Sequence, residues 1–122
     1  MVDLRQPMNL AGRRAVVTGG LGLLGSAISE ALARQGARVL VLDNNDEAWH
    51  QAQDGWRQQG LDMAYHGADA SDLEGIAGLV ASLESSAGGL DIWVNSHYPR
   101  TDDWGLADEQ VTVASWRRNV EM

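Results

Sequence analysis

Apolar residues along the chain follow two alternating patterns, which predict a strand followed by a helix, repeated four times. Short segments that predict strands span residues 14–18, 39–42, 61–66 and 90–95, and the continuous apolar run 39–42 suits a strand covered on both faces. Between and after them, apolar residues recur at helical spacing over about 23–35, 46–59, 73–83 and from 108 onward. This order predicts an α/β fold with a parallel sheet, helices on both of its faces and right-handed crossovers.

Each of these helices has an apolar face that we expect to be buried. The faces are Leu24, Ala27, Ile28, Ala31 and Leu32 in the first helix, Ala48, Trp49, Ala52 and Trp56 in the second, Leu73, Ile76, Ala77, Val80 and Leu83 in the third, and Val113, Trp116 and Val120 in the last. Gly36 and Gly60 are expected to end the first two helices. Ser71 to Glu74 has the form of a capping box for the third. Residues 1–9 are expected to form a loose arm, and residues 96–105 a polar loop.

A glycine-rich turn between the first strand and the first helix carries the candidate chemistry. Its glycines Gly19, Gly22 and Gly25 are evenly spaced. In a dinucleotide site, such glycines permit a turn with positive φ, let a pyrophosphate approach the backbone, and let helix and strand pack closely. The phosphates then lie on N–H groups at the amino terminus of the helix. An ordinary strand-to-helix turn is the alternative. Asp43 favours the dinucleotide, because it ends the next apolar run 18 residues after Gly25, near the spacing of a ribose-binding carboxylate.

Length and charge limit the class of protein. The 122 residues suit one domain, and a net charge of −8 opposes binding to nucleic acid or to an anionic membrane surface. Cysteine is absent from the sequence, which excludes disulfides and thiolate metal sites, and no cluster of residues has the spacing of metal ligands. The sequence has no signal-like or membrane-spanning apolar run, so we expect a cytoplasmic protein.

Taken together, these segments resemble the amino-terminal half of the short-chain dehydrogenase/reductase family. Thr18 to Gly25 looks like the family's glycine turn, and Asp69–Ala70 looks like its Asp-small pair at the adenine. Asn95 is placed like the first asparagine after its fourth strand, and Asn119 like the helix asparagine of its catalytic tetrad. The resemblance implies a Rossmann-like, doubly wound parallel sheet in three αβα layers, of which the chain forms one truncated NAD(P)-binding domain. It also implies NAD as cofactor, with NADP disfavoured by Asp43.

The resemblance assigns roles to single residues. The cofactor-binding residues that it implies are Gly19, Gly22, Leu23, Leu24, Gly25, Asp43, Asn44, Asp69, Ala70, Asn95, Ser96 and His97, and the catalytic residue is Asn119. Structural alternatives remain: Asp43 as a helix-terminal acid, Asp69 as a turn residue, Asn95 as a link between strand and loop. Ser96 and His97 replace the family's Asn and Ala. The bulky His97 either crowds the cofactor or points outward.

The family's catalytic pair of Tyr and Lys is missing from the chain. The family's Lys follows the Tyr by four residues and lowers its pKa, but here Asp69 follows Tyr65 at that offset and Asp102 follows Tyr98. All nine basic residues are arginine, which holds its proton too tightly for this relay. We therefore expect the first half of a doubly wound domain, whose Tyr and Lys come from a second polypeptide or whose catalysis is lost.

Three functions stay open. The first is the NAD-binding portion of an oxidoreductase that transfers hydride between nicotinamide and a hydroxyl or carbonyl carbon of a small-molecule substrate. Residues 95–105 resemble sugar-pathway members of the family, some of which act in flagellin modification and nonulosonate synthesis. The second is a non-catalytic nucleotide-binding or assembly module, which forms homo-oligomers through the last helix or an exposed strand edge. The third is a methyltransferase-like domain that binds S-adenosylmethionine, against which Thr18–Gly19 and Asp69 argue.

Overall fold

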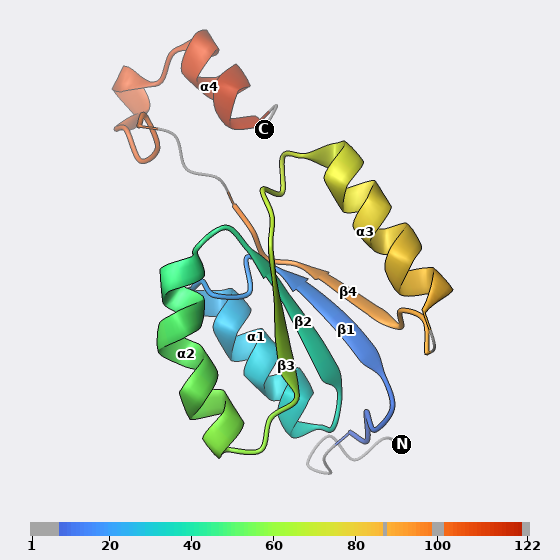
Figure 1. Ribbon diagram of the computed structural model, residues 1–122. Helices are drawn as coiled ribbons and strands as arrows, with labels where there is room; N and C mark the ends of the chain where they lie inside the picture. The colour runs from blue at the N-terminus through green and yellow to red at the C-terminus, as the bar shows by residue number, and fades with distance from the viewer. Residues whose placement is uncertain (1–7, 87, 99–101, 121–122) are drawn as a thin grey trace, which may run out of the picture.

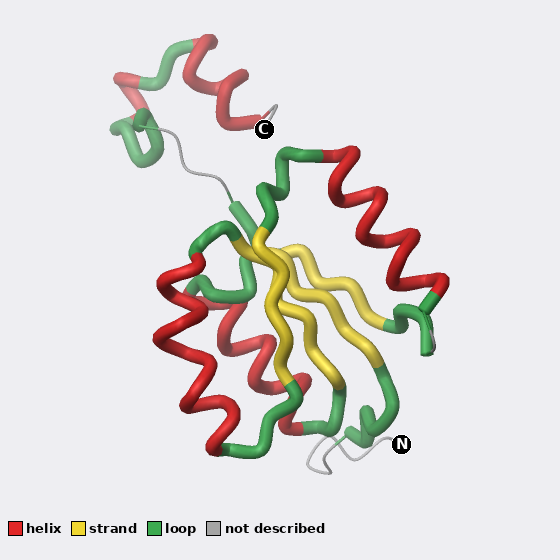
Figure 2. The backbone as a smooth tube through the Cα atoms, in the orientation of Figure 1, coloured by secondary structure: helices red, strands yellow, loops and turns green. Residues whose placement is uncertain are grey.

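The computed structural model describes residues 8–86, 88–98 and 102–120. Its elements in chain order are β1 (Arg14–Thr18), α1 (Leu23–Arg34), β2 (Arg38–Asp43), α2 (Asp46–Gln58), β3 (Met63–Gly67), α3 (Leu73–Ser85), β4 (Ile92–Asn95), η1 (Asp108–Gln110) and α4 (Val113–Val120). The strands form one parallel sheet in the order β3-β2-β1-β4 (Figures 1 and 2), which confirms the α/β fold expected from the alternation. Most of the expected arm at residues 1–9 lies outside the described residues.

The strand order creates a switch point at the carboxyl end of β1. The helices α1 and α2 lie along one face of the sheet, and α3 on its other side leads the chain back to β4 (Figure 1). Thr18 pairs with Leu42 of β2 and with Asn95 of β4, so the segments that follow β1 and β4 leave the sheet side by side. In open α/β sheets, ligands bind in the crevice between connections that diverge in this way. The last described helix, α4, lies beyond the carboxyl ends of the strands (Figure 1).

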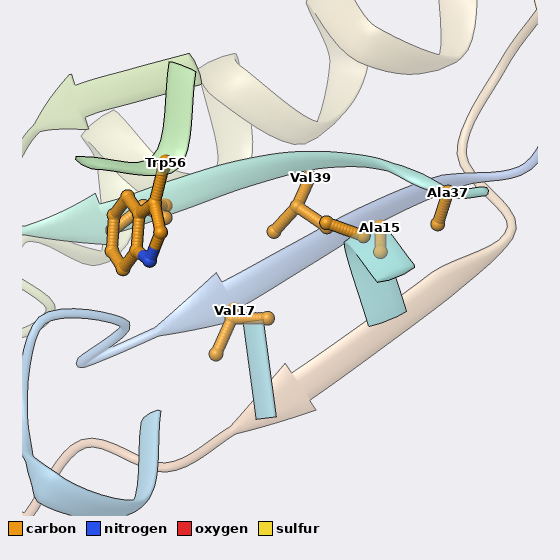
Figure 3. Packing of buried hydrophobic residues seen from close by; sticks show 7 residues of the cluster. Ala15, Val17, Ala37, Val39 and Trp56 are labelled. Carbon is orange, nitrogen blue, oxygen red and sulfur yellow. The ribbon is translucent and has the colours of Figure 1, made fainter. Parts of the chain in front are cut away.

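Alternate side chains of β1 and β2 build the core on the face covered by α1 and α2. The buried cluster consists of Ala15, Val17, Ala33, Ala37, Val39, Val41 and Trp56 (Figure 3). The indole Nε1 of Trp56 donates a hydrogen bond of 2.7 Å to Glu30, which joins α2 to α1. On the opposite face of the sheet, Val16 and Leu42 are 1% exposed. Both faces of the central strands are therefore covered, as the continuous apolar run of β2 predicts for that strand.

The first helix buries a different face from the one expected. Ile28 and Leu32 pack against the core, whereas the other three apolar residues of the expected face are exposed, namely Leu24, Ala27 and Ala31. The buried positions of α1 are Gly25, Ser29 and Ala33. The reason is the close approach of helix and turn: a Cβ added at Gly25 would stand 2.0 Å from the carbonyl oxygen of Gly19. Only small residues fit at this contact.

The expected face of α2 is at least half-buried, but α3 is less covered than its pattern suggests. Leu73 is 77% exposed and Ala77 is exposed, while the other expected residues, Ile76, Val80 and Leu83, are half-buried. The capping residue of α3 is Asp72, which accepts a hydrogen bond of 3.0 Å from the N–H of Gly75. The expected capping box from Ser71 is therefore wrong by one residue, because Ser71 instead donates to Asp69 at 2.7 Å.

The last helix begins later than the pattern predicts. Residues Asp108–Gln110 form a single 3₁₀ turn, and α4 starts at Val113. The hydroxyl of Thr112 accepts a hydrogen bond of 3.1 Å from the N–H of Ser115, which caps the helix at this point. The apolar residues of α4 are on the surface, with exposed fractions of 69% for Val113, 64% for Trp116 and 61% for Val120. Among the described helices, none has the length and apolar character needed to cross a bilayer.

Candidate cofactor site

The glycine turn adopts a conformation that depends on two of its three glycines. Gly19 has a φ of +61°, and its N–H donates to the carbonyl of Leu42 at 2.8 Å. Gly25 lies against the carbonyl of Gly19, and a Cβ at Gly25 would also stand 2.7 Å from the hydroxyl of Ser96. Gly22 is less crowded, since a Cβ would stand 3.3 Å from the Gly19 oxygen. The turn therefore brings the ends of β1, β2 and β4 together around the start of α1.

The amino terminus of α1 is open, unlike those of the other described α-helices. Gly22, its N-cap residue, supplies no side-chain hydrogen bond, and the first turn of α1 has no acidic residue. The starts of α2, α3 and α4 are each capped by a side chain, from Asn45, Asp72 and Thr112 respectively. The N–H groups of Leu23, Leu24 and Gly25 belong to the first turn and have no intrahelical acceptor. Such a terminus is a ready binding site for a phosphate.

Asp43 faces this turn from the end of β2. One carboxylate oxygen, Oδ2, accepts a hydrogen bond of 3.0 Å from the N–H of Leu21. The other, Oδ1, accepts from the N–H groups of Asn44 at 2.8 Å and Asn45 at 3.2 Å. The side chain of Asn44 is exposed, and its described contact with Asp43 runs through its backbone. The carboxylate is therefore fixed beside the glycine turn, where a ribose attached to a bound pyrophosphate would lie.

Residues after β4 join that strand to β1. The hydroxyl of Ser96 donates to the carbonyl of Thr18 at 2.6 Å, and the N–H of Ser96 donates to the same carbonyl at 3.2 Å. Asn95 accepts a hydrogen bond of 2.7 Å from the indole of Trp93 through its amide oxygen. Hence Ser96 and the Asn95 amide oxygen have structural partners at the switch point. His97 packs its backbone against the turn, with its Cα 2.8 Å from where a Cβ of Gly19 would stand.

Asp69 and Ala70 follow β3 on the same edge of the sheet. Asp69 is exposed and accepts hydrogen bonds from the N–H of Ser71 at 2.9 Å and from its hydroxyl at 2.7 Å. These bonds, with a smaller contribution from the nearby His97, lower the pKa of Asp69 below its ordinary value. Ala70 is half-buried in the same turn. The structure thus brings Asp69, Ala70 and His97 to one edge of the sheet with the glycine turn.

Asn119 is the expected site residue that the structure does not bring to the glycine turn. Its amide nitrogen donates to Asp103 at 3.3 Å and to the carbonyl of Ser115, one helical turn earlier, at 2.9 Å. Asp103 also pairs with Arg118 at 3.5 Å. These contacts attach α4 to the loop that precedes it, on the side beyond the strand ends (Figure 1).

Two residues that contact Asp43 were not predicted from the sequence. The N–H of Leu21 binds Asp43, and the hydroxyl of Tyr65 reaches the carbonyl of Asp43 at 3.2 Å. The backbone contact of Leu21 leaves no signal in the sequence. The position of Tyr65 could have been found from the sequence. Side chains alternate between the two faces of a strand, so Tyr65 lies on the same face as its register partner Val41, close to the end of β2.

An open α/β sheet with a glycine turn and an uncapped helix terminus at its switch point defines a dinucleotide-binding class of domain. Residues 13–117 match the family described as short chain dehydrogenase. The chain belongs to this family.

Known proteins similar to the chain are considerably longer. It is 38% identical over 87 residues to D-beta-hydroxybutyrate dehydrogenase of Cupriavidus necator, a match that covers 71% of this chain and 34% of that protein. It is 34% identical over 88 residues to gluconate 5-dehydrogenase of Gluconobacter oxydans, covering 72% and 34%. The structure of L-sorbose reductase from Gluconobacter frateurii, complexed with NADPH and L-sorbose, aligns with a TM-score of 0.71 and 26% identity over 92% of this chain and 42% of that one.

Proposed function

We propose that the chain is the NAD-binding portion of a short-chain dehydrogenase, whose family reaction is hydride transfer between nicotinamide and a hydroxyl or carbonyl carbon. The observation that carries this proposal is the open amino terminus of α1 beside the fixed carboxylate of Asp43. The N–H groups of the first turn would bind the pyrophosphate, and Asp43 would accept hydrogen bonds from the adenosine ribose. Asp69–Ala70 would contact the adenine, and Asn95 and His97 would line the cofactor.

Charge at this edge of the sheet favours NAD over NADP, although both serve the family. The 2′-phosphate of NADP would replace the hydroxyl that Asp43 binds, and the two negative charges would repel each other. The arginines of the sheet and of α1 and α2 lie at the opposite edge, at strand starts and helix ends: Arg13, Arg14, Arg34, Arg38 and Arg57. Parallel strands place all of these far from the glycine turn, so they cannot neutralise a 2′-phosphate there. Of the two arginines in α4, Arg118 pairs with Asp103.

The proposed substrate class is a sugar, polyol or related hydroxy acid, which is what the names of the similar proteins indicate. Tyr98 and Trp104 support a substrate mouth after β4, because their ring centroids lie 4.7 Å apart and about half of each residue is exposed. Asn119 is the candidate catalytic residue of this chain. A cytoplasmic location and a homo-oligomer complete the proposal.

A second candidate is a non-catalytic nucleotide-binding or assembly module. The exposed apolar residues of α4, Val113, Trp116 and Val120, favour association. It differs from the first in one respect: it needs no hydride transfer, but it uses the same cofactor site.

Isothermal titration calorimetry on the chain tests the proposed site. We expect saturable binding of NAD with one site per chain, and an affinity for NADP at least about tenfold lower because of charge repulsion at Asp43. S-Adenosylmethionine, added in competition, is expected not to displace NAD. Absence of NAD binding, or tighter binding of S-adenosylmethionine, would contradict the proposal.

A further inference from the structure

The hydroxyl of Tyr65 reaches both ends of the turn that carries the proposed ribose carboxylate. Tyr65 pairs with Val41 of β2 and packs on the face covered by α1 and α2. Its Oη lies 3.2 Å from the carbonyl oxygen of Asp43 and within hydrogen-bond distance of the Asp46 carboxylate. Asp43 is the last residue of β2 and Asp46 the first of α2. One hydroxyl proton is therefore shared between the two ends of this turn.

The turn in question sets the position of the Asp43 carboxylate. It contains Asn44 and Asn45, and the N–H groups of both donate to Oδ1 of Asp43. Because Oδ2 is tied to Leu21, the carboxylate is held between the turn and the glycine loop. A change in the backbone of the turn would move two of the three donors that orient this carboxylate.

Neighbouring contacts hold the ring of Tyr65 without its hydroxyl. The ring stacks on Trp49, with centroids 5.2 Å apart and planes 12° apart. The N–H of Ala68 donates to the same Asp43 carbonyl at 3.0 Å, so the segment that leads to Asp69 converges on this oxygen too. The Asp43 carbonyl oxygen thus joins the turn from Asp43 to Asp46, through the Tyr65 hydroxyl, to the segment that leads to Asp69. Stacking on Trp49 holds the ring of Tyr65 in place.

We propose that Tyr65 is a positioning residue for cofactor selection: its hydroxyl holds the turn from Asp43 to Asp46 so that the Asp43 carboxylate faces the ribose hydroxyls of NAD. This inference rests on the proposed function. Burial and the hydrogen bond to Asp46 raise the pKa of Tyr65 to about 12, so the hydroxyl remains a donor at neutral pH. Loss of the hydroxyl should loosen the carboxylate and weaken the discrimination between NAD and NADP.

Calorimetry with NAD and NADP on the Tyr65→Phe variant tests the role, since phenylalanine keeps the stacked ring. We expect the NAD affinity to fall roughly three- to tenfold, the effect of one lost hydrogen bond, while the NADP affinity changes less. The ratio of the two affinities is the readout that a merely structural role would leave unchanged. Ser82→Ala, which removes an exposed hydroxyl of α3 that donates to the carbonyl of Leu79 at 3.1 Å within the same helix, is the control and should retain the ratio.

Asp46→Ala tests the same hydrogen bond from the other end and does not disturb the ring of Tyr65. Asp46→Ala should lower the ratio of NAD affinity to NADP affinity, as Tyr65→Phe does. Asp46→Asn keeps an acceptor oxygen and should have the ratio of the unmodified chain. Unchanged ratios in both Tyr65→Phe and Asp46→Ala would overturn the inference and leave the proposed function intact. If the unmodified chain binds no NAD, both the proposed function and this inference fall.

Discussion

Gly25 is the residue on which the glycine turn depends most directly. A Cβ at this position would stand 2.0 Å from the carbonyl oxygen and 2.8 Å from the carbonyl carbon of Gly19. Both are backbone atoms, which cannot move aside as a flexible side chain can. The close approach of α1 to the turn therefore requires glycine here, and it directs the open N–H groups of the helix towards the switch point.

We predict that Gly25→Ala destabilises the chain by at least about 2 kcal/mol, because the new methyl group overlaps fixed backbone. Urea unfolding followed by circular dichroism measures this. The control is Gly78→Ala, in the interior of α3, where an added Cβ would meet nothing within 4 Å. That change should stabilise by about 0.5–1 kcal/mol, through the helix preference of alanine. Equal stability of Gly25→Ala and the unmodified chain would contradict the described packing.

The sequence predicts residues whose roles depend on their separation along the chain. It does not predict residues whose roles depend on contacts that form only in the folded sheet. The glycine spacing indicated the turn, and the position of Asp43 at the end of an apolar run indicated its place beside that turn. Leu21 and Tyr65 contribute through a backbone N–H and a hydroxyl that meet Asp43 only when three strands are paired. Asn119 was assigned by resemblance alone, and its described partners are the α4 backbone and Asp103.

At the scale of elements, β4 is held to β1 at both of its ends. Ser96 binds Thr18 at the carboxyl end, as described above. At the amino end, Asp91 accepts hydrogen bonds from the N–H of Arg14 at 2.9 Å and from the guanidinium of Arg13 at 3.2 Å. The Arg14 N–H, followed by the Arg13 side chain, lowers the pKa of Asp91 below its ordinary value. The pairing of β1 with β4 is therefore linked to the ionisation of this carboxyl.

We predict that stability falls with acid in a way that depends on Asp91. A carboxyl whose pKa is lowered by folding stabilises the folded state above its ordinary pKa, and this contribution is lost as pH falls through the folded-state value. We expect the urea concentration at the unfolding midpoint, measured from pH 7 to pH 3, to decrease once the pH is below about 4. Asp91→Asn should make that drop smaller but not remove it, because Asp69 also has a lowered pKa. An unchanged acid dependence in Asp91→Asn would contradict this assignment.

The order of elements could be predicted from the sequence, whereas the faces of the helices could not be predicted fully. Strand and helix periods are local properties, so alternation was enough to indicate the parallel sheet. An apolar stripe shows that one side of a helix avoids water, but it does not show how closely the helix approaches its neighbour. In α1 that approach is so close that glycine, serine and alanine form the contact, and Leu24 is left 71% exposed.

At the scale of the whole molecule, the distribution of charge separates the two edges of the sheet. The open N–H groups of α1 lie at the carboxyl edge with Asp43 and Asp69, whereas the arginines of the sheet and its first two helices lie at the amino edge, where Arg13 and Arg38 pair with Asp91 and Asp62. A net charge of −8 is therefore compatible with binding a dinucleotide, because the backbone of the glycine turn supplies the local positive potential. The matches to D-beta-hydroxybutyrate dehydrogenase and gluconate 5-dehydrogenase each cover 34% of the relative's length.

The most direct test is a titration of the ¹⁵N-labelled chain with NAD, followed by amide chemical shifts. The account predicts that the largest shifts fall on the amides of Gly19 to Gly25, with further shifts at Asp43 and Asp69, where the pyrophosphate, ribose and adenine are proposed to lie. Largest shifts in the groove between α1 and α2, which Glu30 and Trp56 line, would place the dinucleotide elsewhere and contradict the account. Unchanged spectra at saturating NAD would contradict it as well.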